Sequence, residues 1–376
     1  MTADHPFLFP SLSSAAMGLQ TSRQSVSPIQ SLPRDVLSLI FHRCLSSIHD
    51  DDEETVPATT PITLALVSKQ WKEIVWSSVE LWTSLSLSNI VHKDHINSWF
   101  ARAGSELPLS LRIRHKSSLE QPRLDFVALG DVLLKYADRF EHLHLTLTTR
   151  CWGSLSLTHF RPTRLRSFKI FGEGTLRRII DPIDLTASPQ LSDLAIANTF
   201  PRFLQVNWNA LKKLTLDTML MKEMTEMLSQ STGLAHLVVR NPILEDSWVE
   251  PRSGAGKLPH LQTLDWMEKG RRWETEITWD FLDIQTPRLK TFRFVTEGRI
   301  GARLPLWVEK RSSLSLVVLG ECGAKDGELQ LRVTPQMVVL TQEKAKKFLD
   351  SPSSLPSLDA TEESNRGNGA VWAKTY

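Results

Sequence analysis

The stretch "FEHLHL" at residues 140–145 contains the pattern that decides the fold: an apolar side chain at the first, fourth and sixth places. The same pattern returns six more times, and successive matches begin 20 to 28 residues apart. Self-similarity at such an interval predicts a repeat architecture. The matches are "FEHLHL" at 140, "LRSFKI" at 165, "LSDLAI" at 191, "LKKLTL" at 211, "LAHLVV" at 234, "LQTLDW" at 261 and "LKTFRF" at 289.

No single strand of this kind can bury its apolar edge alone, whereas stacked coils share a continuous core and a parallel sheet. We therefore expect a curved parallel sheet built from consecutive repeats. Weaker matches extend the series at both ends, with "WTSLSL" at 82, "LPLSLRI" at 107, "LSLVVL" at 314 and "LQLRV" at 329.

The repeats resemble those of leucine-rich repeat proteins, with one departure. The asparagine that usually follows the strand in that family is missing, and Met219 and Pro242 stand at two of its places. The backbone groups that the asparagine would satisfy need other partners. We therefore expect an irregular solenoid.

A different periodicity precedes the repeats. In "SLPRDVLSLIFHRCLSSI", residues 31–48, apolar residues recur at steps of three and four, which predicts a helix with a broad apolar face. The acidic run at 49–61 interrupts this pattern and predicts a solvated loop. A second helix is expected from Thr60, which is placed to cap it, with Leu64, Val67, Trp71 and Val75 along one side.

This helical part, residues 31–88, resembles an F-box through "LPxxxLxxIFxxxL" from Leu32 and "LxxVSKxWxxI" from Leu64. The resemblance implies docking on the Skp-type adaptor of a cullin-RING (SCF-type) ubiquitin ligase, with the repeats holding a protein target. The implied adaptor-binding residues are Leu32, Pro33, Val36, Leu37, Ile40, Phe41, Leu64 and Val67.

Three tryptophans lie close together at the end of this part. Trp71 is expected in the core between the helices, and Trp82 is expected to join the helices to the first strand. For Trp76, both a junction role and an adaptor contact remain open. So short a helical segment is more apolar than its own interior can use, which indicates a surface covered by a partner.

The residues between the apolar places of each strand project onto the opposite face of the sheet. These positions are the natural recognition surface, and their mixture of both charge signs suits a protein ligand. The candidate substrate-binding residues are His142, His144, Lys169, Phe171, Asp193, Lys213, Asp217, His236, Arg240, Asp265 and Arg293.

Composition restricts the class of function. The 376 residues carry a net charge of +2, so the overall charge does not indicate nucleic acid as a partner, and binding would have to occur locally, on the basic stretch 161–178. Three separated cysteines favour a reducing compartment, and no membrane span or leader is expected, which places the chain in the cytoplasm, the nucleus or both. No catalytic motif or cofactor site is recognised, and a metal on His142, His144 and His159 is a remote alternative.

The sequence thus predicts an α+β protein without catalytic activity. Its expected parts are a flexible arm (1–30), an F-box-like helical module (31–88), an irregular leucine-rich-repeat-like solenoid (89–340), and a short helix with a disordered tail (341–376). The alternative is a leucine-rich-repeat scaffold or protein-interaction module with no link to a ligase.

Overall fold

The structure is a computed structural model. It describes residues 29, 32–46, 60–88, 92–115, 126–148, 151–152, 155–176, 182–199, 201–243, 257–269, 285–297, 308, 313–321 and 337–340. The predicted arm at 1–30, apart from Ile29, the acidic run at 49–59, the repeat match at 329 and the tail at 341–376 lie outside the described residues.

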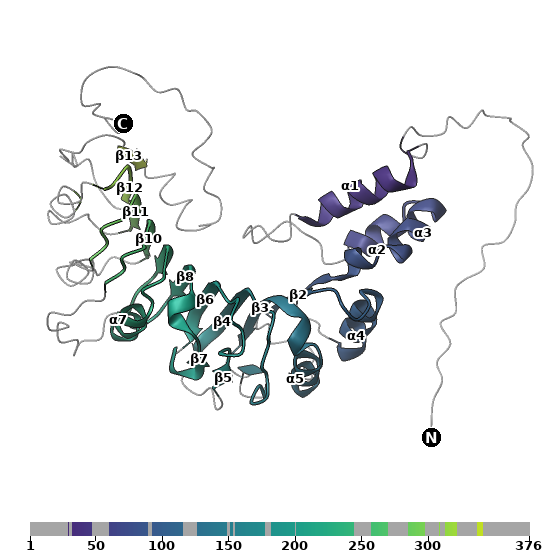
Figure 1. The fold of residues 1–376 in the computed structure, drawn as a ribbon, viewed down its shortest axis with the longest axis horizontal. Coiled ribbons are helices and arrows are strands. Elements are labelled where there is room, and N and C mark those ends of the chain that lie inside the picture. Colours follow the sequence, from purple (N-terminus) through teal and green to yellow (C-terminus); the bar gives the residue numbers. More distant parts are fainter. Residues whose placement is uncertain are drawn as a thin grey trace, which may run out of the picture.

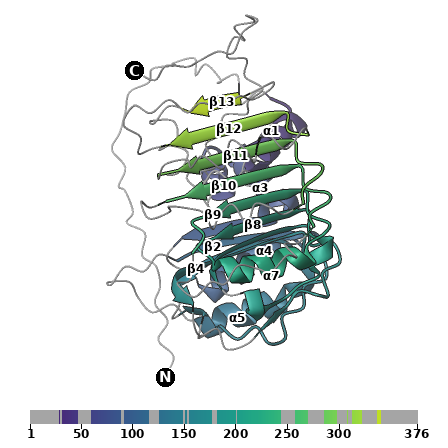
Figure 2. The ribbon, with the colours of Figure 1, turned by 90° about the vertical axis from the view of Figure 1, so that its left-hand side faces the viewer.

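One parallel sheet of eleven strands dominates the described part of the chain (Figure 1). Its strands pair in chain order from one edge to the other, and Figure 2 shows them as a regular ladder. The sheet remains open between its two edge strands, so the described residues form no closed barrel. The strands are β1 (Ser84–Ser88), β2 (Leu109–Arg114), β3 (Phe140–Thr148), β4 (Ser167–Leu176), β6 (Asp193–Thr199), β8 (Lys213–Asp217), β9 (His236–Arg240), β10 (Thr263–Glu268), β11 (Thr291–Thr296), β12 (Leu316–Glu321) and β13 (Met337–Leu340).

The repeat pattern predicts this sheet correctly. Each of the seven matches contains a strand, and their apolar residues, from Phe140 to Phe294, are buried and share one hydrophobic cluster. The weaker matches at 82, 107 and 314 correspond to β1, β2 and β12. The prediction that the leucines share a single interior is therefore confirmed.

Backbone hydrogen bonds connect the coils at the start of each strand. The amide of Lys212 donates to the carbonyl of Ser192 at 2.8 Å, and the amide of Ala235 donates to the carbonyl of Lys212 at 2.9 Å. The same step recurs from Gln262 to Ala235 at 2.8 Å. Each coil thus fixes the register of the next.

A different residue replaces the missing asparagine at the end of the strands. Asn198, Thr218 and Asn241 each directly precede the expected position and adopt left-handed backbone with φ of 52°, 51° and 47°. The Asn241 amide nitrogen donates to Asp217 Oδ1 at 3.1 Å, and its Oδ1 accepts from the backbone of Lys269 at 3.1 Å. One side chain therefore connects three successive coils.

Three short helices precede the sheet: α1 (Arg34–Ser46), α2 (Thr60–Ala65) and α3 (Lys69–Ser77), followed by the 3-10 turn η3 (Val79–Trp82). The prediction of a single second helix is wrong. The first of the two helices ends at Ala65, and Ser68 has extended backbone, with its hydroxyl accepting from the amide of Trp71 at 3.1 Å, so it caps the start of α3. The helical part also ends before residue 88, because β1 pairs with β2 inside the sheet.

Further helices cover the outer face of the curved sheet (Figure 1). They are α4 (Lys93–Arg102), α5 (Phe126–Lys135) and α7 (Met221–Gln230), with short 3-10 turns and the small sheet of β5 (Ile183–Asp184) and β7 (Leu204–Gln205) beside them. In α7, Met221, Met224 and Leu228 are buried in the common core. None of the described helices is both long enough and apolar enough to cross a membrane.

Candidate functional site

The amino-terminal helices have a tightly packed inner side. Leu37 and Phe41 of α1 have no exposed surface, and the rings of Phe41 and Trp71 lie 4.8 Å apart. This confirms that Trp71 belongs to the core between the helices. Leu37 and Phe41, which the sequence places among the adaptor-binding residues, are buried in this core.

Helix α1 and the turn between α2 and α3 carry exposed aliphatic side chains. Val36, Leu39 and Ile40 of α1 are exposed, with Leu39 at 63%. Leu66 and Val67, between α2 and α3, are 81% and 58% exposed. We name these five residues the aliphatic face.

The remaining expected adaptor residues differ in their exposure. Pro33 is exposed, while Leu32 and Leu64 are partly buried against the core. Leu39 and Leu66 were missed in the sequence because neither belongs to the apolar positions that define the two helices.

Tryptophans connect the helices to the sheet. Trp82 is buried, and its Nε1 donates to the carbonyl of Val75 at 3.1 Å. Its ring meets the edge of Trp99 with centroids 4.8 Å apart, and Trp99 Nε1 donates to the carbonyl of Ser84 in β1 at 3.1 Å. The junction expected for Trp82 is therefore present.

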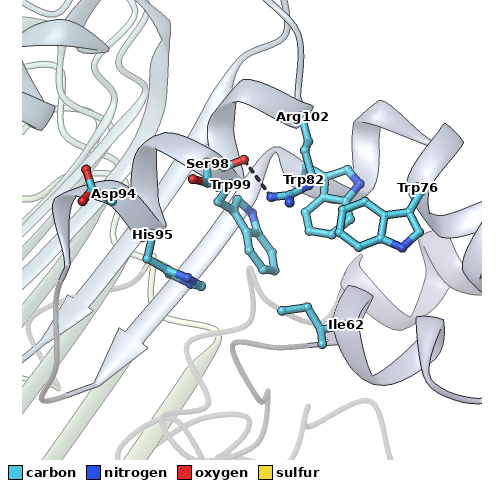
Figure 3. Close-up of a pocket in the computed structure, with 8 residues that line it drawn as sticks. All are labelled: Ile62, Trp76, Trp82, Asp94, His95, Ser98, Trp99 and Arg102. Atoms are coloured by element: carbon cyan, nitrogen blue, oxygen red, sulfur yellow. Dashed lines mark hydrogen bonds between the residues drawn. The ribbon is translucent and has the colours of Figure 1, made fainter. Parts of the chain in front are cut away.

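Trp76 belongs to the same junction and is partly exposed. Its ring stacks on Trp82 at 4.9 Å, and the guanidinium of Arg102 lies over both rings, 4.5 Å and 4.9 Å from their centroids (Figure 3). Arg102 also donates to the carbonyl of Ser98 at 2.8 Å. These side chains, with Ile62, Asp94, His95 and Trp99, surround a cavity of about 320 Å³.

The strand register arranges the candidate recognition residues in rows on the face of the sheet that turns away from the outer helices. One row places Arg112, His144 and Lys169 on the adjacent strands β2, β3 and β4. A second row runs from His142 through Ser167, Asp193 and Lys213 to His236. Neighbouring strands are about 4.8 Å apart, so residues of one row are side by side.

A groove of about 370 Å³ lies over the amino-terminal half of these rows. Phe171 lies just outside it, with its ring 5.1 Å from that of His144. The outward-facing residues that line the groove are Ser84, Ser110, Arg112, His142, His144, Ser167, Lys169, Asp193 and Lys213, together with Arg166 at the strand entrance. We name this region the basic groove.

The carboxy-terminal half of the rows has a different character. Arg293 Nε lies 2.7 Å from Asp265 Oδ1, and the pair is largely buried. Burial raises the pKa of Asp265, while Arg293, Arg240 and His236 oppose this rise. Asp217 is the register partner of Arg240 and accepts a hydrogen bond from Asn241. In this half, Asp265 and Arg293 therefore form an ion pair across adjacent strands.

One carboxyl group lies on the core side of the sheet. Glu268, at the end of β10, is 2% exposed, and burial raises its pKa to about 7. The Nε1 of Trp266 donates to Glu268 Oε1 at 2.5 Å, and the hydroxyl of Thr296 also bonds it, which opposes the rise in pKa. Its position has no connection with the recognition face.

Eight of the sequence-predicted site residues fall into two groups. His142, His144, Lys169, Asp193 and Lys213 meet in the basic groove, whereas Arg240, Asp265 and Arg293 belong to the charge-paired half. Arg112 was missed because its strand belonged to the weaker matches; the same rule of alternate positions applied to "LPLSLRI" would have found it. Among the described residues, no group of three or more His, Cys, Asp or Glu side chains is placed to hold a metal ion.

A scan of protein-family models found no match, and a search among curated proteins found no similar sequence. Function is therefore inferred from the geometry of this chain's own residues and from the resemblance of its motifs.

Proposed function

We propose that the chain is the substrate-recognition subunit of a cullin-RING (SCF-type) ubiquitin ligase. In this proposal α1 to α3 form an F-box-like module that binds a Skp-type adaptor, and the strands form an irregular leucine-rich-repeat solenoid that binds a protein target. The chain would contribute proximity, holding a target lysine near a ubiquitin-charged enzyme supplied by the rest of the complex. It would need no cofactor.

The observation that carries the proposal is the aliphatic face. Side chains such as Leu39, Leu66 and Val67 remain exposed on α1 and on the turn between α2 and α3, although Leu37, Phe41 and Trp71 of the same helices are buried. Exposed apolar side chains gathered on one small element are typical of protein interaction sites. Three of the residues implied by the F-box resemblance, Val36, Ile40 and Val67, belong to this face.

The tryptophan junction supports a receptor that holds two proteins in a defined relation. Trp82 and Trp99 are both nearly fully buried, and their hydrogen bonds tie α3 and β1 to the same cluster. A close-packed junction resists bending, because each displaced ring would lose its dispersion contacts. A target on the sheet would then keep a fixed position relative to the adaptor.

The experiment that tests the proposal is co-purification with a Skp-type adaptor. We expect Leu66→Asp/Val67→Asp to abolish the adaptor band, because a carboxylate buried in an apolar interface loses its hydration. Val127→Asp is the matched control, since Val127 is a 65% exposed aliphatic residue on α5, which lies apart from α1, α2 and α3 (Figure 1).

All three proteins should fold alike, because the substituted side chains are largely exposed; thermal unfolding checks this. Undiminished adaptor binding by the double variant, or equal loss in the Val127 control, would contradict the proposal. The first of these results would favour the scaffold alternative, in which the helices cap the repeats and bind no ligase component.

A further inference from the structure

We propose that the cavity lined by Trp76, Trp82 and Trp99 binds a short acidic segment of a partner protein. An aromatic side chain of that segment would enter the cavity, and a neighbouring carboxylate would meet Arg102. The cavity lies between α2, α3 and α4 (Figure 3). It shares no residue with the aliphatic face or the basic groove, so the inference does not rest on the proposed function.

Indole rings form much of the cavity wall. Trp82 and Trp99 are each 1% exposed, and their rings meet edge to face, so they close the inner side of the cavity. Trp76 stacks on Trp82, and the aliphatic side chain of Ile62 completes the apolar lining. Aromatic pairs prefer offset-stacked and edge-to-face arrangements. An aromatic side chain that enters the cavity can adopt either arrangement against these rings.

Trp76 is the accessible member of the cluster. Its two neighbours are buried, whereas 44% of its own surface is exposed to solvent. Tryptophan carries a large apolar surface and is enriched among the residues that dominate the binding energy of protein interfaces. The exposed part of Trp76 is therefore available to a partner.

Arg102 supplies the charge complementarity that selects an acidic ligand. Its guanidinium lies over Trp76 and Trp82 and donates to the carbonyl of Ser98. Among the described residues this carbonyl is its only hydrogen-bond acceptor, and no carboxylate is ion-paired with it. A guanidinium has five N–H donors in one plane, so those that remain can meet a carboxylate. The rings hold this group in place beforehand, which lowers the entropy cost of binding.

The charges around the cavity fix the orientation of the ligand. Asp94 and His95 lie at the start of α4, on the other side of Trp99 from Arg102 (Figure 3). The Asp94 carboxylate would repel a second carboxylate at that side. The acidic group of the ligand therefore belongs at Arg102.

A basic segment suits the cavity less well. A cation would gain most over the face of an indole ring. Arg102 already occupies that position over Trp76 and Trp82, and it would repel a second positive charge. The cavity therefore favours a ring that is accompanied by a negative charge.

The volume of the cavity limits the ligand to about one side chain. At about 320 Å³ it is at the lower end of the range for ligand sites, roughly 300 to 1,000 Å³. Trp76 and Arg102 are exposed at its rim, so a chain on either side of the inserted ring can continue over the surface. A protein segment fits both features, because it carries the ring and the carboxylate on adjacent residues.

Fluorescence anisotropy with the full chain tests the inference. The first probe is a labelled glycine/serine peptide with a central phenylalanine between two glutamates. The second has alanine in place of the phenylalanine, and the third has lysines in place of the glutamates. We expect the first peptide to bind at least about tenfold more tightly than either of the others, because only it offers both the ring and the carboxylates.

Variants locate the site. Arg102→Glu should weaken binding of the first peptide by about tenfold or more and strengthen binding of the lysine peptide, a gain that misfolding cannot produce. Lys222→Glu makes the same change of charge at an exposed position on α7 and should alter neither affinity. Trp76→Ala should reduce the affinity for the first peptide to nearly that for the alanine peptide. Trp76→Phe keeps a ring and should retain most of the affinity.

Several results would overturn the inference. They are no binding of the first peptide at millimolar concentration, equal binding of the alanine or the lysine peptide, and unchanged affinity in either Arg102→Glu or Trp76→Ala. Displacement of the peptide by 3-phenylpropionate below the peptide's own dissociation constant would do so as well, because the cavity would then suit a small aromatic acid. The assay contains no adaptor, so its outcome and that of the co-purification experiment are independent.

Discussion

The buried Glu268 makes the stability of the β10 region depend on pH. Its carboxyl group lies in the core, where desolvation raises the pKa from 4.5 to about 7 despite hydrogen bonds from Trp266 and Thr296. Glu268→Gln has nearly the same shape, keeps a carbonyl oxygen for the Trp266 N–H, and cannot ionise. The substitution therefore isolates the effect of the charge.

The sign of this pH dependence follows from the direction in which the pKa of Glu268 is shifted. Below pH 4.5 the carboxyl is neutral in both the folded and the unfolded chain, and its contribution to folding is fully present. Between pH 4.5 and about 7 the unfolded chain ionises while the folded chain stays neutral, so the free energy of unfolding falls as the pH rises. One pKa unit corresponds to about 1.36 kcal/mol, so the total loss is about 3 kcal/mol.

Hydrogen exchange with mass spectrometry measures this effect locally. Peptides covering 261–269 and 285–297 contain β10 and β11, which pair from Thr263 to Glu268. At pH 4.5 we expect Glu268→Gln and the wild type to exchange at similar rates. At pH 8 the wild type should exchange roughly a hundredfold faster in these peptides, since each 1.36 kcal/mol is about tenfold in the opening equilibrium.

Comparing the two proteins at each pH cancels the intrinsic dependence of exchange on pH. Glu226→Gln is the control, because Glu226 is an exposed carboxylate on α7. Glu226→Gln should exchange at the same rate as the wild type, so the ratio of their exchange rates should be near one at both pH 4.5 and pH 8. A ratio for Glu268→Gln that does not change between pH 4.5 and pH 8 would refute the reasoning, because it would mean that the carboxyl ionises alike in the folded and unfolded chain.

Two further predictions concern the stacking of the coils and are read from denaturant unfolding. Gly233→Ala should reduce the free energy of unfolding by about 1–3 kcal/mol, because an added Cβ would overlap the backbone carbonyl of Asn209. An unchanged denaturation midpoint would contradict this, because it would mean that the segments around Gly233 and Asn209 can move apart without loss of stability. Asn241→Ala should lower the free energy of unfolding by about 1–2 kcal/mol more than Asn241→Gly does. Both variants lose the hydrogen bonds to Asp217 and Lys269, but only alanine is strained at φ 47°. Equal stability of the two variants would contradict this account.

The repeated apolar pattern was sufficient to predict the strands. Leucines at the fourth and sixth places, such as Leu214 and Leu216, are buried because alternate residues of a strand lie on the same face, and this face reaches the core. The same rule predicted which residues project to the other face, including His144 and Lys169. These features follow from the spacing of apolar residues along the chain, which can be read directly from the amino-acid sequence.

Features that depend on neighbouring coils were missed or only partly predicted. The break between α2 and α3 depends on a hydroxyl of Ser68 that binds a backbone amide, which competes with continuing the helix. The left-handed Asn241 gains its bonds from the coils before and after it. The burial of Leu37 and Phe41 between the helices could not be predicted, because a broad apolar helix face does not reveal which of its sides is covered.

The strands, their inward and outward faces, and the helical nature of the amino-terminal part can all be predicted from the amino-acid sequence, because each follows from the spacing of apolar residues along the chain. Which outward-facing charged residues become neighbours depends instead on how the strands pair. Parallel pairing places Arg112 beside His144 and Lys169, and Asp265 beside Arg293. These neighbours depend on strand register between coils, which is set by packing and backbone hydrogen bonds across the whole sheet.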